Sequence, residues 1–372
     1  SSSASPVYGI QTARLSKDMC YLLAMSRWFP MNGYQQDRAK GTFRLTVPRG
    51  YLIAMEGELT SREQLDDQET FTFVSRKAGF PGSLAAAAFN EITIDVGQVE
   101  IKYYIMDNKL DYVDAHTEVV TQLLDLYSEK FSPYPLQTFK IVVVDNESLL
   151  AFSAPGIEFL ADRAFGVNPN INLLAKEIAY QWWAFLVSPK TEFDLWLKEG
   201  FSAYSALLYQ ESISSEAGFA RELKDVAVAA LLYEDESSIL NAHQLDFYSP
   251  EYNSVLKSKG AYVLHMLRGV IGQTKLFDLL KQYVYNFGYQ KASIGDFKAL
   301  AEKISEKDLD YFFSQWIEQS GVPEFEYEFT TLRVKDGFRV DGVVRQDLDL
   351  FKMPVEIRVE TDGDSEIKQI EV

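Results

Sequence analysis

Two glutamates, Glu177 and Glu199, lie in apolar segments at a spacing that could support acid–base chemistry. Glu177 belongs to "LLAKEIAYQWW" (residues 173–183), where Lys176 precedes it directly and Tyr180 follows three residues later. On a helix, positions i and i+4 share a face, so Lys176 and Tyr180 point the same way and Glu177 lies beside them. A glutamate there can act as a general base on metal-bound water when its neighbours at i and i+4 bind the metal. The chemistry of this stretch therefore depends on what a Lys and a Tyr can do.

The spacing around these residues is that of a family of zinc peptidases. In HExxH zinc peptidases the i and i+4 positions are histidine ligands, and here eighteen residues separate Tyr180 from Glu199. HExxH, eighteen residues and then Glu is the ligand pattern of the M1 (gluzincin) aminopeptidase family. The segments "DLWLKEGFSAY" and "EIAYQWWAFLVSPK" are similar to that family's glutamate-ligand segment and to the end of its HExxH helix. The sequence therefore resembles an M1 aminopeptidase over most of residues 20–355.

The chain departs from the family pattern at the residues that would carry the chemistry. Lys176 and Tyr180 stand where the histidine ligands belong, and neither an ammonium nor a phenol is a good zinc ligand. The family's catalytic tyrosine lies three residues before the glycine of a YxKG-like motif, which is "KSKG" here, so Lys257 takes its place. Of three protein ligands, only Glu199 is left. The resemblance thus implies a catalytically degenerate member with no catalytic residues, no metal site and no cofactor, because zinc is expected to be lost.

One more position follows from the resemblance. The family's amine-binding GxMEN loop maps onto "PGIEF", with Gly156, Ile157 and Glu158 in the places of a Gly, the Met and the Glu. On that alignment Glu158 keeps the carboxylate that reads a substrate's free N-terminus. Glu158 is equally consistent with a surface or loop carboxylate that has no ligand. The vestigial site then comprises six residues: Glu158, Lys176, Glu177, Tyr180, Glu199 and Lys257.

The two lysines of this site allow two interpretations. Without zinc, Glu177 and Glu199 would be neighbouring buried like charges, which is unfavourable unless each is paired. Lys176 and Lys257 could supply the missing positive charge, or both could extend to solvent. The sequence leaves these two interpretations open.

The hydrophobic patterning places the site in a mainly helical central part of the chain. From residue 41 to about 106, short alternating runs predict a β-rich region. A helical pattern over residues 110–131 precedes "FKIVVVD", which predicts a buried strand. Helical patterns then dominate in seven further segments: 172–188, 194–212, 216–233, 258–271, 275–287, 294–304 and 307–319. Alternation resumes after residue 321, so the order is β, then mainly α, then β.

This order and the resemblance together predict a multidomain α+β protein in three parts. Residues 1–99 are expected to form part of an N-terminal β-domain, and residues 100–320 a thermolysin-like, mainly helical domain of the M1 peptidase type. Residues 321–372 are expected to begin a β-sandwich domain. The chain opens on "SSSASP" without a Met and ends inside a strand-like pattern, which predicts a piece of a longer protein.

The charge of the chain argues against one class of partner. With 54 acidic and 36 basic residues, the net charge of -18 repels phosphate backbones and anionic membranes. No apolar run approaches the roughly 18 residues of a membrane span, so neither nucleic acid nor membrane insertion is expected. Nothing in the composition identifies the compartment. Similarity to secreted bacterial family members suggests an extracytoplasmic place, periplasmic or secreted.

Three functions follow from the altered site. The first is an inactive M1 homologue, a pseudopeptidase without zinc, whose groove binds a peptide or a protein partner or serves as a scaffold. The second is an enzyme with a remodelled, zinc-independent site that uses Lys176 or Lys257 with Glu177. Flanking glutamates push a lysine pKa upward, which disfavours a lysine base. The third is an inert spacer, in which the chain's own side chains would fill the groove.

Overall fold

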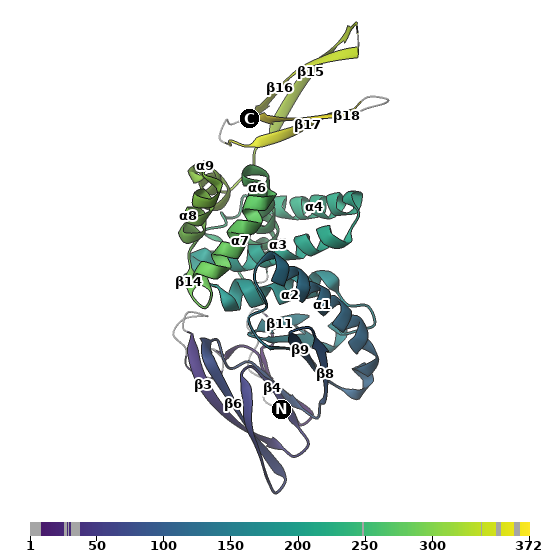
Figure 1. Ribbon diagram of the computed structural model, residues 1–372, viewed down its shortest axis with the longest axis vertical. Coiled ribbons are helices and arrows are strands. Elements are labelled where there is room, and N and C mark those ends of the chain that lie inside the picture. Colours follow the sequence, from purple (N-terminus) through teal and green to yellow (C-terminus); the bar gives the residue numbers. More distant parts are fainter. Residues whose placement is uncertain are drawn as a thin grey trace.

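The computed structural model describes residues 9–25, 28, 30, 38–247, 249–335, 337–346, 351–360 and 365–372. Figure 1 shows an elongated molecule in which strands, helices and hairpins follow one another from the N-terminus to the C-terminus. This is the predicted succession, and it confirms the α+β fold class. The serine-rich start, "SSSASP", lies outside the described residues. Among those described, no helix is both long and apolar enough to cross a membrane.

The first part of the chain packs two antiparallel sheets against each other. Their strand orders are β1-β2-β7-β4 and β3-β6-β5. Burial alternates along β6, so Phe71 and Phe73 lie on its inner face and pack with Ile53 and Met55 of the other sheet. The strands are β1 (Ala13–Leu15), β2 (Met19–Leu22), β3 (Ala39–Pro48), β4 (Leu52–Met55), β5 (Glu58–Leu65), β6 (Gln68–Gly79) and β7 (Leu84–Ala87).

A five-stranded sheet of order β11-β12-β10-β9-β8 separates these sheets from the helices. Ile141 and Val143 of β10 belong to the helical core, whereas Val142 and Val144 pack with the N-terminal sheet, which explains why "FKIVVVD" has no polar face. β11 is the edge strand and runs antiparallel to β12. The strands are β8 (Asn90–Val96), β9 (Val99–Ile105), β10 (Thr138–Val144), β11 (Ala151–Ala154) and β12 (Ile157–Ala161).

The first boundary expected from the sequence falls inside this central sheet. β8 pairs with β9 along its whole length, from Asn90 with Ile105 to Val96 with Val99. A boundary at residue 99 therefore separates two paired strands, and β8 groups with the central sheet. Alternation predicts a strand but does not show which sheet the strand joins.

The helices pack on the sheet through an aromatic core. Trp183 contacts Phe131 and Phe201 edge to face. The pattern predicts one helix over residues 172–188. In the structure α2 ends at Tyr180, and a fully buried π-helical segment, η4 (Gln181–Leu186), follows it directly. The helices are α1 (Val113–Lys130), α2 (Ile171–Tyr180), α3 (Trp196–Ile213), α4 (Glu216–Leu231), α5 (Pro250–Tyr252), the π-helical η7 (Asn253–Lys259), α6 (Gly260–Ile271), α7 (Gln273–Phe287), α8 (Ile294–Ser305), α9 (Asp310–Phe313) and the π-helical η8 (Ser314–Glu318).

Two hairpins form the β region predicted after the helices. β15 (Phe325–Val334) pairs with β16 (Gly337–Gln346), and β17 (Pro354–Glu360) pairs with β18 (Ser365–Glu371). Both lie at the end of the molecule opposite the N-terminal sheets (Figure 1). A short parallel pair, β13 (Ser188–Pro189) with β14 (Lys291–Ala292), connects the loop after η4 to the loop after α7.

Two glycines allow α3 and α6 to cross closely. A Cβ added at Gly260 would lie 3.0 Å from the Cα of Gly200 and 2.8 Å from Cδ1 of Trp196. The indole Nε1 of Trp196 donates a hydrogen bond of 2.9 Å to the carbonyl of Gly260. Gly200 directly follows Glu199, and Gly260 directly follows the segment that carries Lys257. The crossing therefore sets how two of the predicted site residues lie relative to each other.

Substitution of Gly260 tests this contact. Gly260→Ala is expected to lower the free energy of unfolding by about 1–3 kcal/mol, because the methyl group must displace backbone and indole atoms. Gly269→Ala in the same helix is the matched control, since a Cβ there meets no atom within 4 Å. It should leave stability unchanged or raise it by up to about 1 kcal/mol. Urea titrations of both variants give the comparison, and equal effects would refute the close crossing.

Candidate functional site

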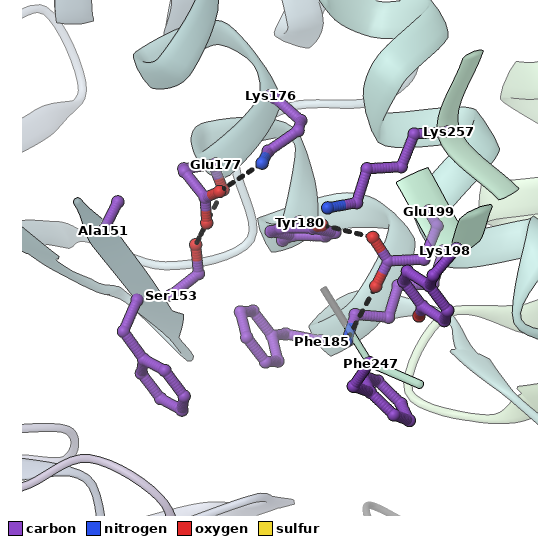
Figure 2. Close-up of a pocket in the computed structure, with 12 residues that line it drawn as sticks. Ala151, Ser153, Lys176, Glu177, Tyr180, Phe185, Lys198, Glu199, Phe247 and Lys257 are labelled. Atoms are coloured by element: carbon purple, nitrogen blue, oxygen red, sulfur yellow. Dashed lines mark hydrogen bonds and ion pairs between the residues drawn. The ribbon is translucent and has the colours of Figure 1, made fainter. Parts of the chain in front are cut away.

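A pocket lies where α2, α3, β11 and η7 meet. Its volume is about 560 Å³, which includes space open to solvent. Charged side chains and aromatic rings share its wall (Figure 2). The lining residues are Ala151, Phe152, Ser153, Lys176, Glu177, Tyr180, Phe185, Lys198, Glu199, Phe247, Tyr252 and Lys257. Five of the six predicted site residues are thus brought together, and Glu158 is the exception.

Helix α2 supplies Lys176, Glu177 and Tyr180. The helix begins after Asn170, whose side chain accepts a hydrogen bond of 3.1 Å from the backbone N–H of Leu173. The ammonium of Lys176 lies 2.8 Å from Glu177 Oε1, and its side chain is 24% exposed against 8% for Glu177. Burial alone would lower the pKa of Lys176, but the charges of Glu177 and Glu199 raise it above its ordinary value. Lys176 is therefore held as a cation beside Glu177.

Helix α3 supplies Glu199, which is bonded from two sides. The phenol of Tyr180 donates a hydrogen bond of 2.7 Å to Glu199 Oε2, and the ammonium of Lys198 lies 3.4 Å from Oε1. Burial would raise the pKa of Glu199, but Lys198, Lys257 and the Tyr180 hydrogen bond lower it to about 2. Burial and the negative Glu199 raise the pKa of Tyr180 well above its ordinary value. Tyr180 therefore keeps its proton and Glu199 is ionised.

Segment η7 supplies Lys257. Its ammonium lies 5.8 Å from the ring centre of Tyr252, a pocket residue on α5. The pKa of Lys257 is lowered, mainly by burial and also by the positive charges of Lys176 and Lys198. The negative charges of Glu199 and Glu177 raise it, but by less. Lys257 is thus a partly buried lysine that faces two carboxylates.

Ser153 of β11 connects two carboxyl groups. Its Oγ lies 2.7 Å from Glu177 Oε2 and 2.7 Å from Glu158 Oε2. A hydroxyl has one hydrogen and can donate to only one of them, so the other carboxyl must be protonated and donate to Ser153 Oγ. Burial, and then the charge of Glu177, raise the pKa of Glu158 well above its ordinary value. Glu158 is therefore the neutral acid, and Ser153 donates to Glu177.

The structure corrects the role expected for Glu158. Its side chain is fully buried on β12 and does not line the pocket, so it is neither a surface carboxylate nor a group that can meet a ligand's amine there. The strand that faces the pocket is β11, whose residues 151–154 ("AFSA") carry no carboxyl group. Glu158 is the acidic residue of "PGIEF", but it lies on β12, whereas the preceding strand β11 forms the wall of the pocket.

Sequence reasoning missed other members of the site. Lys198 lies directly before Glu199 in the quoted motif, so its place could have been anticipated. Ser153, Phe185 and Phe247 carry no sequence signal, because a short edge strand, a π-helical turn and a loop bring them to the pocket. Elsewhere among the described residues, one group of carboxylates could hold a cation, Glu302 with Asp308 and Asp310, and none of these lines the pocket.

Removal of the Lys176 charge tests the ion pair. Lys176→Met is expected to lower the free energy of unfolding at pH 7 by about 1–3 kcal/mol, because it leaves Glu177 buried without its nearest cation. The exposed Lys224 of α4 provides the control variant Lys224→Met, expected to change stability by less than about 0.5 kcal/mol. Urea titrations followed by tryptophan fluorescence measure both. Equal stability of the two variants would favour a lysine that merely extends to solvent.

Comparisons with known proteins agree with this fold. The profile described as "Peptidase family M1 domain" matches residues 115–316, which is more than half of the chain. Aminopeptidase M1-D of Oryza sativa subsp. japonica is 25% identical over 263 residues, which cover 65% of this chain and 30% of that protein. Aminopeptidase N of Streptomyces lividans is 23% identical over 340 residues, covering 84% of this chain and 39% of that protein. The chain spans about a third of the length of such relatives.

Solved structures share the fold. The M1 zinc metallopeptidase from Deinococcus radiodurans superposes with a TM-score of 0.70 at 21% identity, covering 84% of this chain and 72% of that chain. Aminopeptidase A of Legionella pneumophila, in complex with aspartic acid, gives a TM-score of 0.77 at 17% identity over 98% of this chain and 45% of that chain. At these identities the likeness establishes the shared fold alone. Together with the profile match over residues 115–316, it shows that the chain belongs to peptidase family M1.

Proposed function

We propose that this chain is a catalytically degenerate M1 member whose pocket binds a peptide or protein ligand without zinc-dependent hydrolysis. One observation carries the proposal. The two helix positions that would be histidine ligands hold Lys176 and Tyr180, and these side chains are bonded to Glu177 at 2.8 Å and to Glu199 at 2.7 Å (Figure 2). The carboxylates that would act as base and as ligand are therefore already engaged by the side chains that replace the histidines.

The donor set does not suit a catalytic zinc ion. A zinc ligand needs a free lone pair, and catalytic sites use three protein ligands drawn from His, Cys, Asp and Glu. Lys176 is an ammonium whose pKa is raised, and Tyr180 keeps its phenolic proton, so neither offers such a lone pair. Glu199 alone is of the right type. These properties support the loss of the metal, and with it the loss of the activated water on which Glu177 would act.

The shape of the pocket favours binding over a purely structural spacer. A spacer would have its groove filled by its own side chains, whereas this pocket keeps unfilled space that opens to solvent. Charged groups and aromatic rings share the wall, as in sites that orient a ligand by a few polar contacts. If the chain acts as a scaffold, a larger partner would bind at the same pocket.

One observation favours a second function, an enzyme that works without zinc. A lysine base needs a lowered pKa, and burial lowers the pKa of Lys257. Lys176 is unsuited, because its pKa is raised by the neighbouring glutamates. Such an enzyme would therefore depend on Lys257 near Glu177. Hydrolysis that resists chelators and is abolished by Lys257→Gln would identify it.

Bound zinc per chain tests the main proposal. Protein purified without chelator and dialysed against metal-free buffer is expected to hold close to no zinc and to release no product from aminoacyl 4-nitroanilides. The double variant Lys176→His with Tyr180→His is the matched control. It should bind about one zinc per chain by elemental analysis, because it recreates two imidazole ligands beside Glu199. Hydrolysis is expected to stay low, since Lys257 still occupies the tyrosine position.

About one zinc in the unaltered chain, with chelator-sensitive hydrolysis, would overturn the proposal. It would mean that another ligand set exists and that the pocket is a working peptidase site.

A further inference from the structure

The pocket carries an excess of positive charge in a strongly acidic protein. Among the residues that the structure describes, three lysines line it, Lys176, Lys198 and Lys257, together with two carboxylates, Glu177 and Glu199. Glu158 adds no further charge, because the single hydroxyl hydrogen of Ser153 requires one carboxyl of the Glu158–Glu177 pair to be protonated. Three ammonium groups against two carboxylates leave one positive charge, although the chain as a whole carries -18. A ligand that neutralises this charge would have to be an anion.

The two lysines that replace family residues converge on one place. Figure 2 shows the ammonium ends of Lys176 and Lys257 on the same side of the Tyr180 ring, with that of Lys176 directed toward Glu177. The two ammonium groups are close enough that the positive charge of Lys176 lowers the pKa of Lys257. Two like charges that face a common space repel each other, and an anion between them would attract both. A carboxylate can accept hydrogen bonds from two ammonium groups at once.

The same pocket is unsuited to a ligand's amine. Glu177 already accepts from Ser153 and lies 2.8 Å from Lys176, and Glu199 accepts from Tyr180 and lies 3.4 Å from Lys198. The wall strand β11 adds no carboxyl group in residues 151–154. An ammonium entering here would face three others, which is unfavourable at short range.

Aromatic rings accompany the charged groups. Phe185 and Phe247 lie on the side of Tyr180 away from the ammonium groups of Lys176 and Lys257 (Figure 2). Phe152 also lines the pocket. A ligand with a carboxylate at one end and an apolar or aromatic group at the other would match both parts, since the rings would exclude water from that group.

We infer that the pocket binds an apolar residue through its free α-carboxylate, held between Lys176 and Lys257, with its side chain against Phe185 and Phe247. The inference rests on the proposed binding function and names its ligand class. The free carboxylate could belong to the C-terminus of a peptide or to a single acylated amino acid. Both sources share the chemistry that the pocket would recognise.

Titration calorimetry with the unaltered chain, in a buffer free of carboxylates, tests the ligand class. The probes are N-acetyl-Gly-Gly-Phe, the same peptide as its C-terminal amide, and Phe-Gly-Gly amide, which offers only a free amine. The acid is expected to bind at least tenfold more tightly than either amide, and its affinity should fall as NaCl is raised. N-acetylphenylalanine distinguishes the sources, because equal affinity would mean that the terminal residue alone is recognised.

Two variants locate the carboxylate. Lys257→Gln is expected to weaken binding of the acid at least tenfold and to leave binding of the amide unchanged, because only the acid loses a charged contact. Lys224→Gln, on the exposed face of α4, should change neither affinity. If Lys257→Gln fails to fold, the comparison of acid with amide in the unaltered chain decides.

Three results would overturn the inference: equal affinity for the acid and its C-terminal amide, equal or tighter binding of Phe-Gly-Gly amide, or no measurable binding of either acid. All three leave the proposed loss of zinc chemistry standing, because that is judged by bound zinc and by hydrolysis. Conversely, one zinc per chain would refute the proposed function whatever these titrations give.

Discussion

Two carboxylates, Glu177 and Glu199, lie almost fully buried on neighbouring helices, and buried charges of one sign must be matched by the opposite charge. Lys176 and Lys198 lie beside them, Lys257 faces them from η7, and the phenol of Tyr180 donates to Glu199. The whole pocket depends on this balance. Its shape, its protonation states and the ligand it would accept all follow from which positive groups are present.

The surrounding structure holds these charges in place. α2 and α3 are anchored on an aromatic core, and the contact of Gly200 with Gly260 brings α6 and the end of η7 against α3. On the other side, β11 contributes the Ser153 hydroxyl, which joins the neutral Glu158 to Glu177. The bonded polar groups form two sets, one around Glu177 and one around Glu199, and the charges of Lys176 and Lys257 act on both. A change at one lysine is therefore expected to be felt at both carboxylates.

Family membership identifies the fold of this chain, whereas its function depends on the residues of the pocket. The M1 fold is shared with aminopeptidases whose chains are about three times as long as the matched segment, and the fold alone does not decide what this chain does. Function has to be argued from Lys176, Tyr180 and Lys257. On that basis, the pocket would suit an anion.

The order of elements and most of the site can be predicted from the amino-acid sequence alone. Apolar periodicity predicts the ends of α1, α3 and β10 to within three residues, because the burial of each element is reflected in its local sequence. The spacing of Lys176, Glu177, Tyr180 and Glu199 likewise predicts that their side chains share one site. Three features depend instead on the folded chain: β11 rather than β12 forms the pocket wall, Glu158 is a buried neutral acid, and the lysines pair with the glutamates. They are set by sheet order and by distances between elements far apart in the chain, which no local pattern encodes.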